Sequence, residues 1–202
     1  MSPNLRDKHA AATRRALVRS ARTLFAKHGY EATGIDQIAA HAGATRGAVY
    51  HHFAGKRELL RATLDELQGA LAKRVAIASA GEADPQERTR KALATFLDAC
   101  VERKTARILL EDAPAVLGWD VWRELDAQHF LGMTEAAIRD LVTAGHLPAV
   151  DPEILAHLWM GALTEAALLL VRNPGPDTRA RVDAALEVMV GPPASRSGQG
   201  AE

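Results

Sequence analysis

The sequence predicts an all-helical fold of about nine helices, and three features of its 202 residues support that class. Alanine, leucine, arginine and glutamate, which favour helices, dominate the chain. Apolar residues recur at three- and four-residue intervals, and no stretch shows the sustained two-residue alternation of a strand. Glycine and proline residues divide the chain into segments of helical length, which marks where the helices start and end.

The first predicted helix covers about residues 12–28 and ends at Gly29, a suitable C-terminal cap. Its apolar stripe consists of Leu17, Ala21, Leu24 and Phe25. A different face of the same helix is basic and carries Arg15, Arg19 and Arg22. This face either meets a polyanion or is simply a solvated basic surface.

Two short helices and one long helix are predicted next. The first short helix covers about 35–42 and is broken by Gly43-Ala44. Thr45 caps the second, 46–52, because its hydroxyl can accept a free backbone N–H of the first turn. The long helix, 56–78, follows an Ala54-Gly55 turn, and its apolar rows contain Leu59, Leu60, Leu64, Leu67 and Leu71.

The remaining helices are predicted over about residues 85–103, 104–112, 119–144, 152–172 and 177–190. Two of them begin with an Asp-Pro pair, in which aspartate caps the helix and proline occupies its first position: Asp84-Pro85 and Asp151-Pro152. The Ala113-Pro114 pair is expected to interrupt the chain. The tail at 193–202 is small and polar, which predicts disorder.

The charge of the chain is unevenly distributed although its net charge is zero. Residues 1–61 contain 11 Lys or Arg against 4 acidic residues, a net charge of +7. The remainder contains 14 Lys or Arg against 21 acidic residues, a net charge of −7. A basic segment joined to an acidic body indicates that the N-terminal end meets a polyanion.

No feature of the sequence suggests secretion or membrane insertion. The N-terminus lacks the apolar core of a signal peptide. The apolar run near Trp159 to Val171 is interrupted by Thr164 and Glu165, and it is shorter than the roughly 20 residues that cross a bilayer. We therefore expect a cytoplasmic protein without a membrane partner.

The sequence predicts neither an enzyme nor a cofactor or metal site. It contains no phosphate-cradling glycine loop, no HExxH and no nucleophile elbow. Cys100, the single cysteine, cannot form an internal disulfide or a multi-thiolate zinc site, and it falls within a helix where a buried inert thiol is expected. The histidines of the second half, His129, His146 and His157, lack a metal-ligand spacing.

The spacing of three small or apolar residues predicts a helix-turn-helix. Ala39 allows two helices to cross closely, Gly43 forms the turn four residues later, and Val49 locks the second helix six residues after that. In this geometry the N-terminal end of the second helix enters the major groove of DNA.

The stretch from Thr13 to Leu60 contains the run GYEATGIDQIAAHAGATRGAVYHHFAGKRELL, with a Tyr-x-His-Phe-x-x-Lys signature. On these residues the stretch resembles the DNA-binding domain of the tetracycline-repressor (TetR) family. It implies a three-helix DNA-binding domain over residues 1–55, a helical effector-binding and dimerisation domain over 56–192, and a tail over 193–202.

The resemblance also implies which residues contact DNA. The groove-entering turn corresponds to Thr45, Arg46, Gly47 and Ala48, of which Arg46 offers a bidentate fork to guanine. Tyr50 and His51 match positions that touch phosphates, sugars or thymine methyls, and His52 and Lys56 match phosphate clamps. Two positions depart from the family pattern: Gly34 removes a hydroxyl contact, and Asp36 is either a partner for a cytosine amine or an outward, solvated carboxylate.

Bulky side chains in the second half suggest a ligand pocket. Polar groups accompany the aromatic and sulfur-containing residues of one predicted helix: Trp119, Trp122, Asp126, His129, Phe130 and Met133. Trp159 and Met160 extend the cluster. An apolar pocket with a few orienting groups would suit a mostly apolar or aromatic small molecule, but the same residues could equally fill a core.

The expected function is that of a repressor that binds a palindromic DNA operator as a homodimer and is released by a small-molecule effector. The dimer surface is expected on the last two helices, on Leu155, Leu158, Ala162, Leu163, Ala166, Leu169, Val182, Leu186 and Met189. The alternative is a helix-turn-helix DNA-binding protein without a ligand, or an activator.

Overall fold

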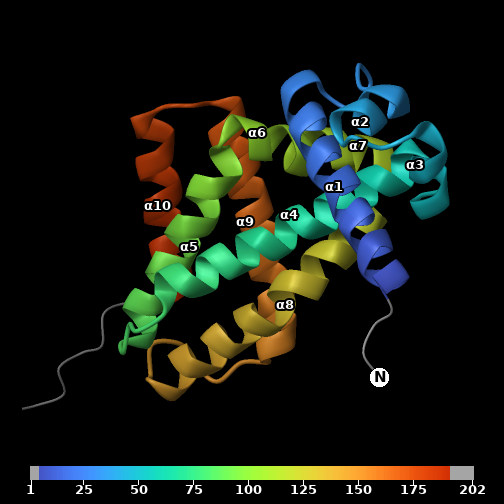
Figure 1. Ribbon diagram of the computed structural model, residues 1–202. Coiled ribbons are helices and arrows are strands. Elements are labelled where there is room, and N and C mark those ends of the chain that lie inside the picture. Colours follow the sequence, from blue (N-terminus) through green and yellow to red (C-terminus); the bar gives the residue numbers. More distant parts are fainter. Residues whose placement is uncertain (1–4, 192–202) are drawn as a thin grey trace, which may run out of the picture. The chain divides into compact units, whose positions relative to one another are not determined.

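The computed structural model describes residues 5–191, and all regular elements among them are helical (Figure 1). In chain order they are α1 (Leu5–His28), α2 (Ile35–His41), α3 (Arg46–His52), α4 (Lys56–Ser79), α5 (Pro85–Val101), α6 (Arg103–Ala106), the π-helix η1 (Arg107–Asp112), α7 (Ala113–Leu117), α8 (Trp119–Thr143), α9 (Pro152–Arg172) and α10 (Pro176–Val190). If the continuous run from α6 to α7 is counted as one segment, the described residues form nine helical segments, which confirms the predicted fold class. The tail predicted at 193–202 lies outside the described residues.

The chain forms two compact units. Among the described residues, the N-terminal unit contains 5–70 together with Glu102–Leu125, and the C-terminal unit contains Leu71–Val101 and 126–191. Helices α4 and α8 therefore each contribute residues to both units. The sequence-based division at residue 55 follows the first three helices, whereas the N-terminal unit also includes the beginning of α4 and a later segment.

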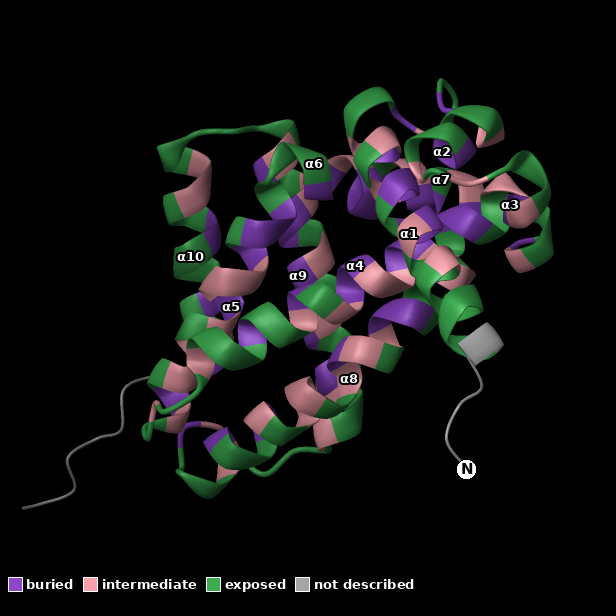
Figure 2. Ribbon diagram, in the orientation of Figure 1, coloured by how far each residue is buried: buried purple, intermediate pink, exposed green. Residues whose placement is uncertain are grey.

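The N-terminal unit is built on the apolar rows that the sequence predicts. Helices α1, α2 and α3 pack on one another, the beginning of α4 lies beside them (Figure 1), and the inward side chains of these helices are buried. The fully buried members are Leu17, Ala21, Phe25, Ile38, Val49, Leu59, Leu60 and Leu64. Burial alternates with exposure around each helix, as expected for amphipathic helices (Figure 2).

The expected interruption at Ala113-Pro114 is wrong, because the helical run continues to Leu117. The π-helix η1 precedes Pro114, which occupies the first turn of α7. Because proline has no backbone N–H, Pro114 donates no hydrogen bond to the preceding turn, yet the run stays helical through this position. The break comes instead at Gly118, whose φ of 83° lies in the left-handed region that favours glycine.

Helices α5, α9 and α10 pack on one another within the C-terminal unit. Because α9 and α10 turn their inner faces to this core, four residues expected on the dimer surface are instead buried: Leu163, Ala166, Val182 and Leu186. The exposed large apolar side chains of the two helices are Ile154, Leu158, Leu169 and Val188. These four residues are therefore removed from the expected surface, whereas the expected members Leu158, Ala162 and Leu169 are exposed and the dimer contact itself stays a prediction.

Helix α9 is long and apolar enough to cross a membrane by length and composition. Its 21 residues exceed the apolar run considered from sequence, because the helix starts at Pro152 and passes through Thr164 and Glu165. The fold accounts for this apolar character in another way. Trp159, Leu163 and Leu170 face the core of the C-terminal unit.

Candidate nucleic-acid interface and internal cavity

The α2–α3 pair has the geometry predicted for a helix-turn-helix. Gly43 adopts a φ of 65°, and the N–H of Ala44 donates to the carbonyl of Ala39 at 2.9 Å. The hydroxyl of Thr45 accepts from the N–H of Ala48 at 3.2 Å, which confirms the predicted cap. Val49 is fully buried and fixes α3 against the core.

The predicted DNA-binding residues of α3 form an exposed surface. Thr45, Arg46, Gly47, Tyr50 and His51 are exposed, whereas Ala48 and His52 are half-buried. This pattern leaves the first turn of α3 accessible to a DNA groove. The assignment of individual contacts stays a prediction.

Arg46 is held by two neighbouring side chains. Its Nη1 donates to Oδ2 of Asp36 at 2.8 Å, and its Nη2 donates to the hydroxyl of Tyr50 at 3.5 Å. The guanidinium also lies 5.6 Å from the centroid of the Tyr50 ring. The hydrogen bond with Tyr50 and the charge of Asp36 raise the pKa of Arg46 above its usual range.

Asp36 is an outward carboxylate, as one of the two interpretations from the sequence expected, and it also forms an ion pair with Arg46; a contact with a cytosine amine stays a prediction. The carboxylate is exposed, but it is paired with a protein side chain rather than merely solvated. The partners are ten residues apart on different helices. No helical spacing rule relates them, so this pair could not be predicted from the sequence.

Lys56, the predicted phosphate clamp, is positioned by Tyr30. Its Nζ donates to the backbone carbonyl of Tyr30 at 3.0 Å and lies 4.1 Å from the centroid of the tyrosine ring. The backbone N–H of Tyr30 in turn donates to Asp112 at 3.0 Å. An ammonium group has three protons, so Lys56 can still donate to a phosphate. Tyr30 is a supporting residue that sequence reasoning missed.

His52, the second predicted clamp, is biased toward its neutral form. Burial is the largest cause that lowers the pKa of His52, and the charges of the nearby His51 and Arg14 lower it further. The rings of His51 and His52 meet edge to face with centroids 5.0 Å apart. His52 is therefore better suited to donate a hydrogen bond to a phosphate as a neutral imidazole than to form an ion pair with it as a protonated one.

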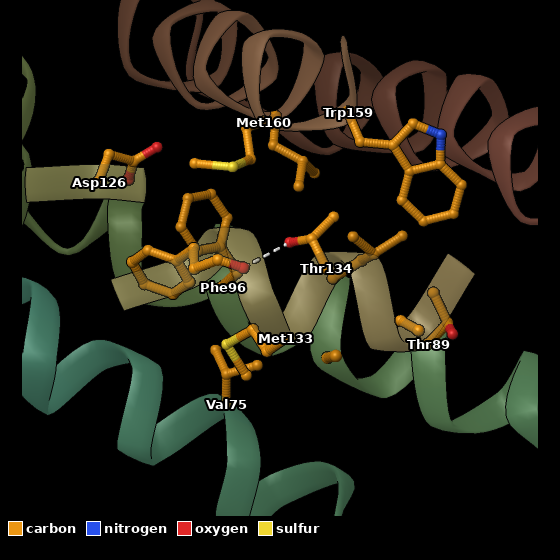
Figure 3. A pocket seen from close by; sticks show the side chains of 13 residues that line it. Val75, Thr89, Phe96, Asp126, Met133, Thr134, Trp159 and Met160 are labelled. Atoms are coloured by element: carbon orange, nitrogen blue, oxygen red, sulfur yellow. Dashed lines mark hydrogen bonds between the residues drawn. The ribbon is translucent and has the colours of Figure 1, made fainter. Parts of the chain in front are cut away.

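The C-terminal unit contains a cavity of about 70 Å³ (Figure 3). Four helices line it: α4 with Val75; α5 with Thr89, Ala92, Leu93 and Phe96; α8 with Asp126, Phe130, Met133, Thr134 and Ala137; and α9 with Trp159, Met160 and Leu163. In the view of Figure 3, Asp126 lies at one end, and Trp159 and Thr89 lie at the other. The cavity is thus apolar along most of its length.

Asp126 is the acidic residue of the cavity wall. Its side chain is buried, and this burial raises the pKa of the carboxyl to about 7. The hydroxyls of Thr89 and Thr134 also belong to the wall, and they donate to the backbone carbonyls of Pro85 and Phe130 at 2.8 and 2.9 Å.

Three of the six predicted ligand-binding residues line this cavity: Asp126, Phe130 and Met133. Trp119, Trp122 and His129 do not, and this part of the expectation is corrected. The two tryptophans belong to the N-terminal unit, where their rings meet edge to face at 5.5 Å. The buried indole of Trp122 donates to the carbonyl of Leu109 at 2.7 Å, so it has a core role. Phe96 on α5 completes the wall and was missed, because a distant helix contributes it.

Within residues 5–191, no group of three or more His, Cys, Asp or Glu side chains is placed to hold a metal ion. Cys100 is buried, as the sequence indicates.

Comparison with known proteins places these features in a family. Residues 86–192, more than half of the chain, match the tetracyclin repressor-like C-terminal domain, and residues 17–63 match bacterial regulatory proteins of the tetR family. The chain is 26% identical to the Transposon Tn10 TetC protein of Escherichia coli, over 82% of this chain and 83% of that protein.

Two solved structures are similar over most of their length. A TetR-family transcriptional regulator from Pectobacterium atrosepticum is 34% identical, with a TM-score of 0.76 over 90% of this chain and 94% of that one. RolR in complex with resorcinol is 20% identical, with a TM-score of 0.75 over 93% and 92% of the two chains, a likeness of fold.

Proposed function

The chain belongs to the TetR family of bacterial transcriptional regulators, and from this premise we propose that it represses transcription as a homodimer on a palindromic operator and leaves the operator when a small molecule binds. The observation that carries the proposal is the exposed, braced first turn of α3, joined in one chain to an internal cavity. The proposal assigns the protein to the cytoplasm and gives it no catalytic activity.

Operator binding is supported by the charge and geometry of the N-terminal unit. One helix in a major groove reads only a few base pairs, so useful affinity requires two such helices at a fixed spacing. Selection from random duplexes should return a two-fold symmetric site with half-sites about one helical turn apart. Recovery of only asymmetric sites would contradict the proposed palindrome.

Dimerisation through the last two helices is supported by exposed apolar side chains on both. Leu158 on α9 is 65% exposed and Val188 on α10 is 81% exposed. Ile154 and Leu169 lie on α9 as well. Such side chains gain stability when a second copy covers them. An isologous four-helix contact would cover them on both subunits at once.

Release by a small molecule is supported by the position of α4 in the chain. This continuous helix begins at the predicted clamp Lys56, and its Val75 lines the cavity. A ligand that displaces Val75 would tilt the helix and shift Lys56, so ligand and operator would weaken one another. The expected coupling is about 1–3 kcal/mol.

The test is reciprocal and separates this function from a ligand-independent regulator or activator. Thermal melting against a metabolite panel identifies ligands, because a bound ligand raises the melting temperature. Such a ligand must weaken operator binding by the factor by which operator weakens ligand binding. A ligand that binds the cavity and leaves operator affinity unchanged would favour the alternative.

A further inference from the structure

The wall of the C-terminal cavity contains a single ionisable side chain. Of the 13 residues that line it, Asp126 alone can carry a charge, and none is Lys, Arg or His. An anionic ligand would therefore enter a mostly apolar space and meet a carboxyl group instead of a cation. A charge buried without an opposite charge is strongly unfavourable, so the wall disfavours carboxylates and phosphates.

The hydroxyl groups of the wall present acceptors rather than donors. The protons of Thr89 and Thr134 are already donated to the carbonyls of Pro85 and Phe130. Their oxygens retain lone pairs. A matching ligand therefore carries hydrogen-bond donors.

The remainder of the wall suits an apolar group next to a positive charge. The rings of Phe96 and Phe130 meet edge to face at 5.4 Å, and Trp159 is buried at the other end. Aromatic faces attract cations, and the sulfur atoms of Met133 and Met160 are polarisable.

The size of the cavity limits the ligand. An apolar cavity of about 150 Å³ admits benzene, whereas this one measures about 70 Å³. Met133 and Met160 are unbranched and flexible, so rotation of their side chains can enlarge the space for one ring.

We propose that this cavity binds a small lipophilic amine, with its ammonium group at Asp126 and its apolar part against Phe96 and Phe130. The inference rests on the proposed function and adds to it the chemical class of the effector.

The protonation behaviour of Asp126 agrees with this assignment. Burial raises the pKa of the carboxyl to about 7, because the apolar surroundings penalise the ionised form. An ammonium group beside it would stabilise that form. Amine binding near neutral pH should therefore be accompanied by release of a proton from Asp126.

The experiment compares three probes of the same ring size and different charge: benzylamine, benzyl alcohol and benzoate. Calorimetric titration of the full chain at pH 8 should show benzylamine binding about tenfold more tightly than benzyl alcohol. Benzoate should not bind detectably. Equal affinity for the amine and the alcohol, preference for benzoate, or no binding of benzylamine at millimolar concentration would each overturn the inference.

Asp126→Asn tests the role of the carboxyl group at nearly constant volume. The variant should lose the preference for benzylamine and keep its affinity for benzyl alcohol. Asp120→Asn, at an exposed acid of the same helix, should behave as the unaltered protein. An amine preference that survives Asp126→Asn would contradict the assignment, and the three-probe comparison on the unaltered chain stands even if the variant folds poorly.

Operator affinity measured in the presence of each of the three probes separates this inference from the proposed function. If benzyl alcohol or benzoate binds and releases the operator better than benzylamine, the ligand class is wrong and the regulatory function stands. If benzylamine binds with the expected preference but leaves operator affinity unchanged, the ligand class stands and the regulatory role of the cavity is wrong.

Discussion

The guanidinium of Arg46 on α3 donates to the carboxylate of Asp36 on α2 at 2.8 Å, so an ion pair joins the two helices of the helix-turn-helix. Both side chains are more than 60% exposed. Exposed pairs contribute little to stability, typically about 0–1 kcal/mol. We therefore expect the pair to act by orienting Arg46, whose proposed contact is a guanine.

Asp36→Ala should relax the base preference at the operator position that Arg46 reads, because the guanidinium would lose the ion pair that orients it. Arg46→Ala should cost about 1–3 kcal/mol of operator binding, and adding Asp36→Ala to it should cost nothing further. Selection from random DNA measures the preference, and Glu31→Ala is a control at another exposed acid. If Asp36→Ala only strengthens binding to all sequences, Asp36 repels DNA instead of positioning Arg46.

Lys56→Ala should weaken binding to all DNA sequences alike, because a phosphate contact carries no base information. The slope of log affinity against log salt should fall by about 1. Lys73→Ala, at an exposed lysine on the same helix, should leave this slope unchanged. An unaltered slope for Lys56→Ala would show that the ammonium group of Lys56 bonds to Tyr30 without also contacting a phosphate.

Trp122→Phe should lower the free energy of unfolding by about 1–3 kcal/mol, because the carbonyl of Leu109 would lose the indole donor in a buried site. Trp119→Phe should change it by less than about 0.5 kcal/mol, because this side chain is 45% exposed. Denaturant titration measures both. Equal effects would contradict the core role assigned to Trp122.

The local parts of the structure were predictable, and the long-range parts were not. The cap at Thr45 and the buried Val49 depend on neighbours within a few residues, and both are found as predicted. The cavity joins α4, α5, α8 and α9, so the contribution of Phe96 depends on packing that no periodicity reveals. Trp119 and Trp122 illustrate the opposite error: they share a helix with Phe130 but belong to the other compact unit.

The stability of the protein should fall between about pH 5.5 and 8.5 because of Asp126. Its pKa is about 7 when folded and near 3.8 when unfolded, so the folded state binds more protons in this range. Stability then decreases as pH rises, by about 2 kcal/mol for this group. Asp126→Asn should remove this decrease and be the more stable form at pH 8.5. Thermal melting across the range measures the difference, and parallel curves for the two proteins would contradict the assigned pKa.

Leu158→Glu should convert the proposed dimer into a monomer, because a charge would replace an apolar side chain at the proposed contact between α9 helices. Ile77→Glu is a matched control: both side chains are 65% exposed, but Ile77 lies on α4, outside the proposed contact. Light scattering at micromolar concentration should give a dimer for the unaltered chain and Ile77→Glu, and a monomer for Leu158→Glu.

A monomer keeps its α3 surface, so Leu158→Glu should still bind a single half-site as weakly as the unaltered chain does. It should lose the additional affinity for the full palindrome, because this gain arises from holding two recognition helices at a fixed distance. A monomeric unaltered chain, or a Leu158→Glu variant that remains dimeric, would show that α9 does not form the contact. The operator measurements would then have to be explained by another surface that brings two α3 helices together.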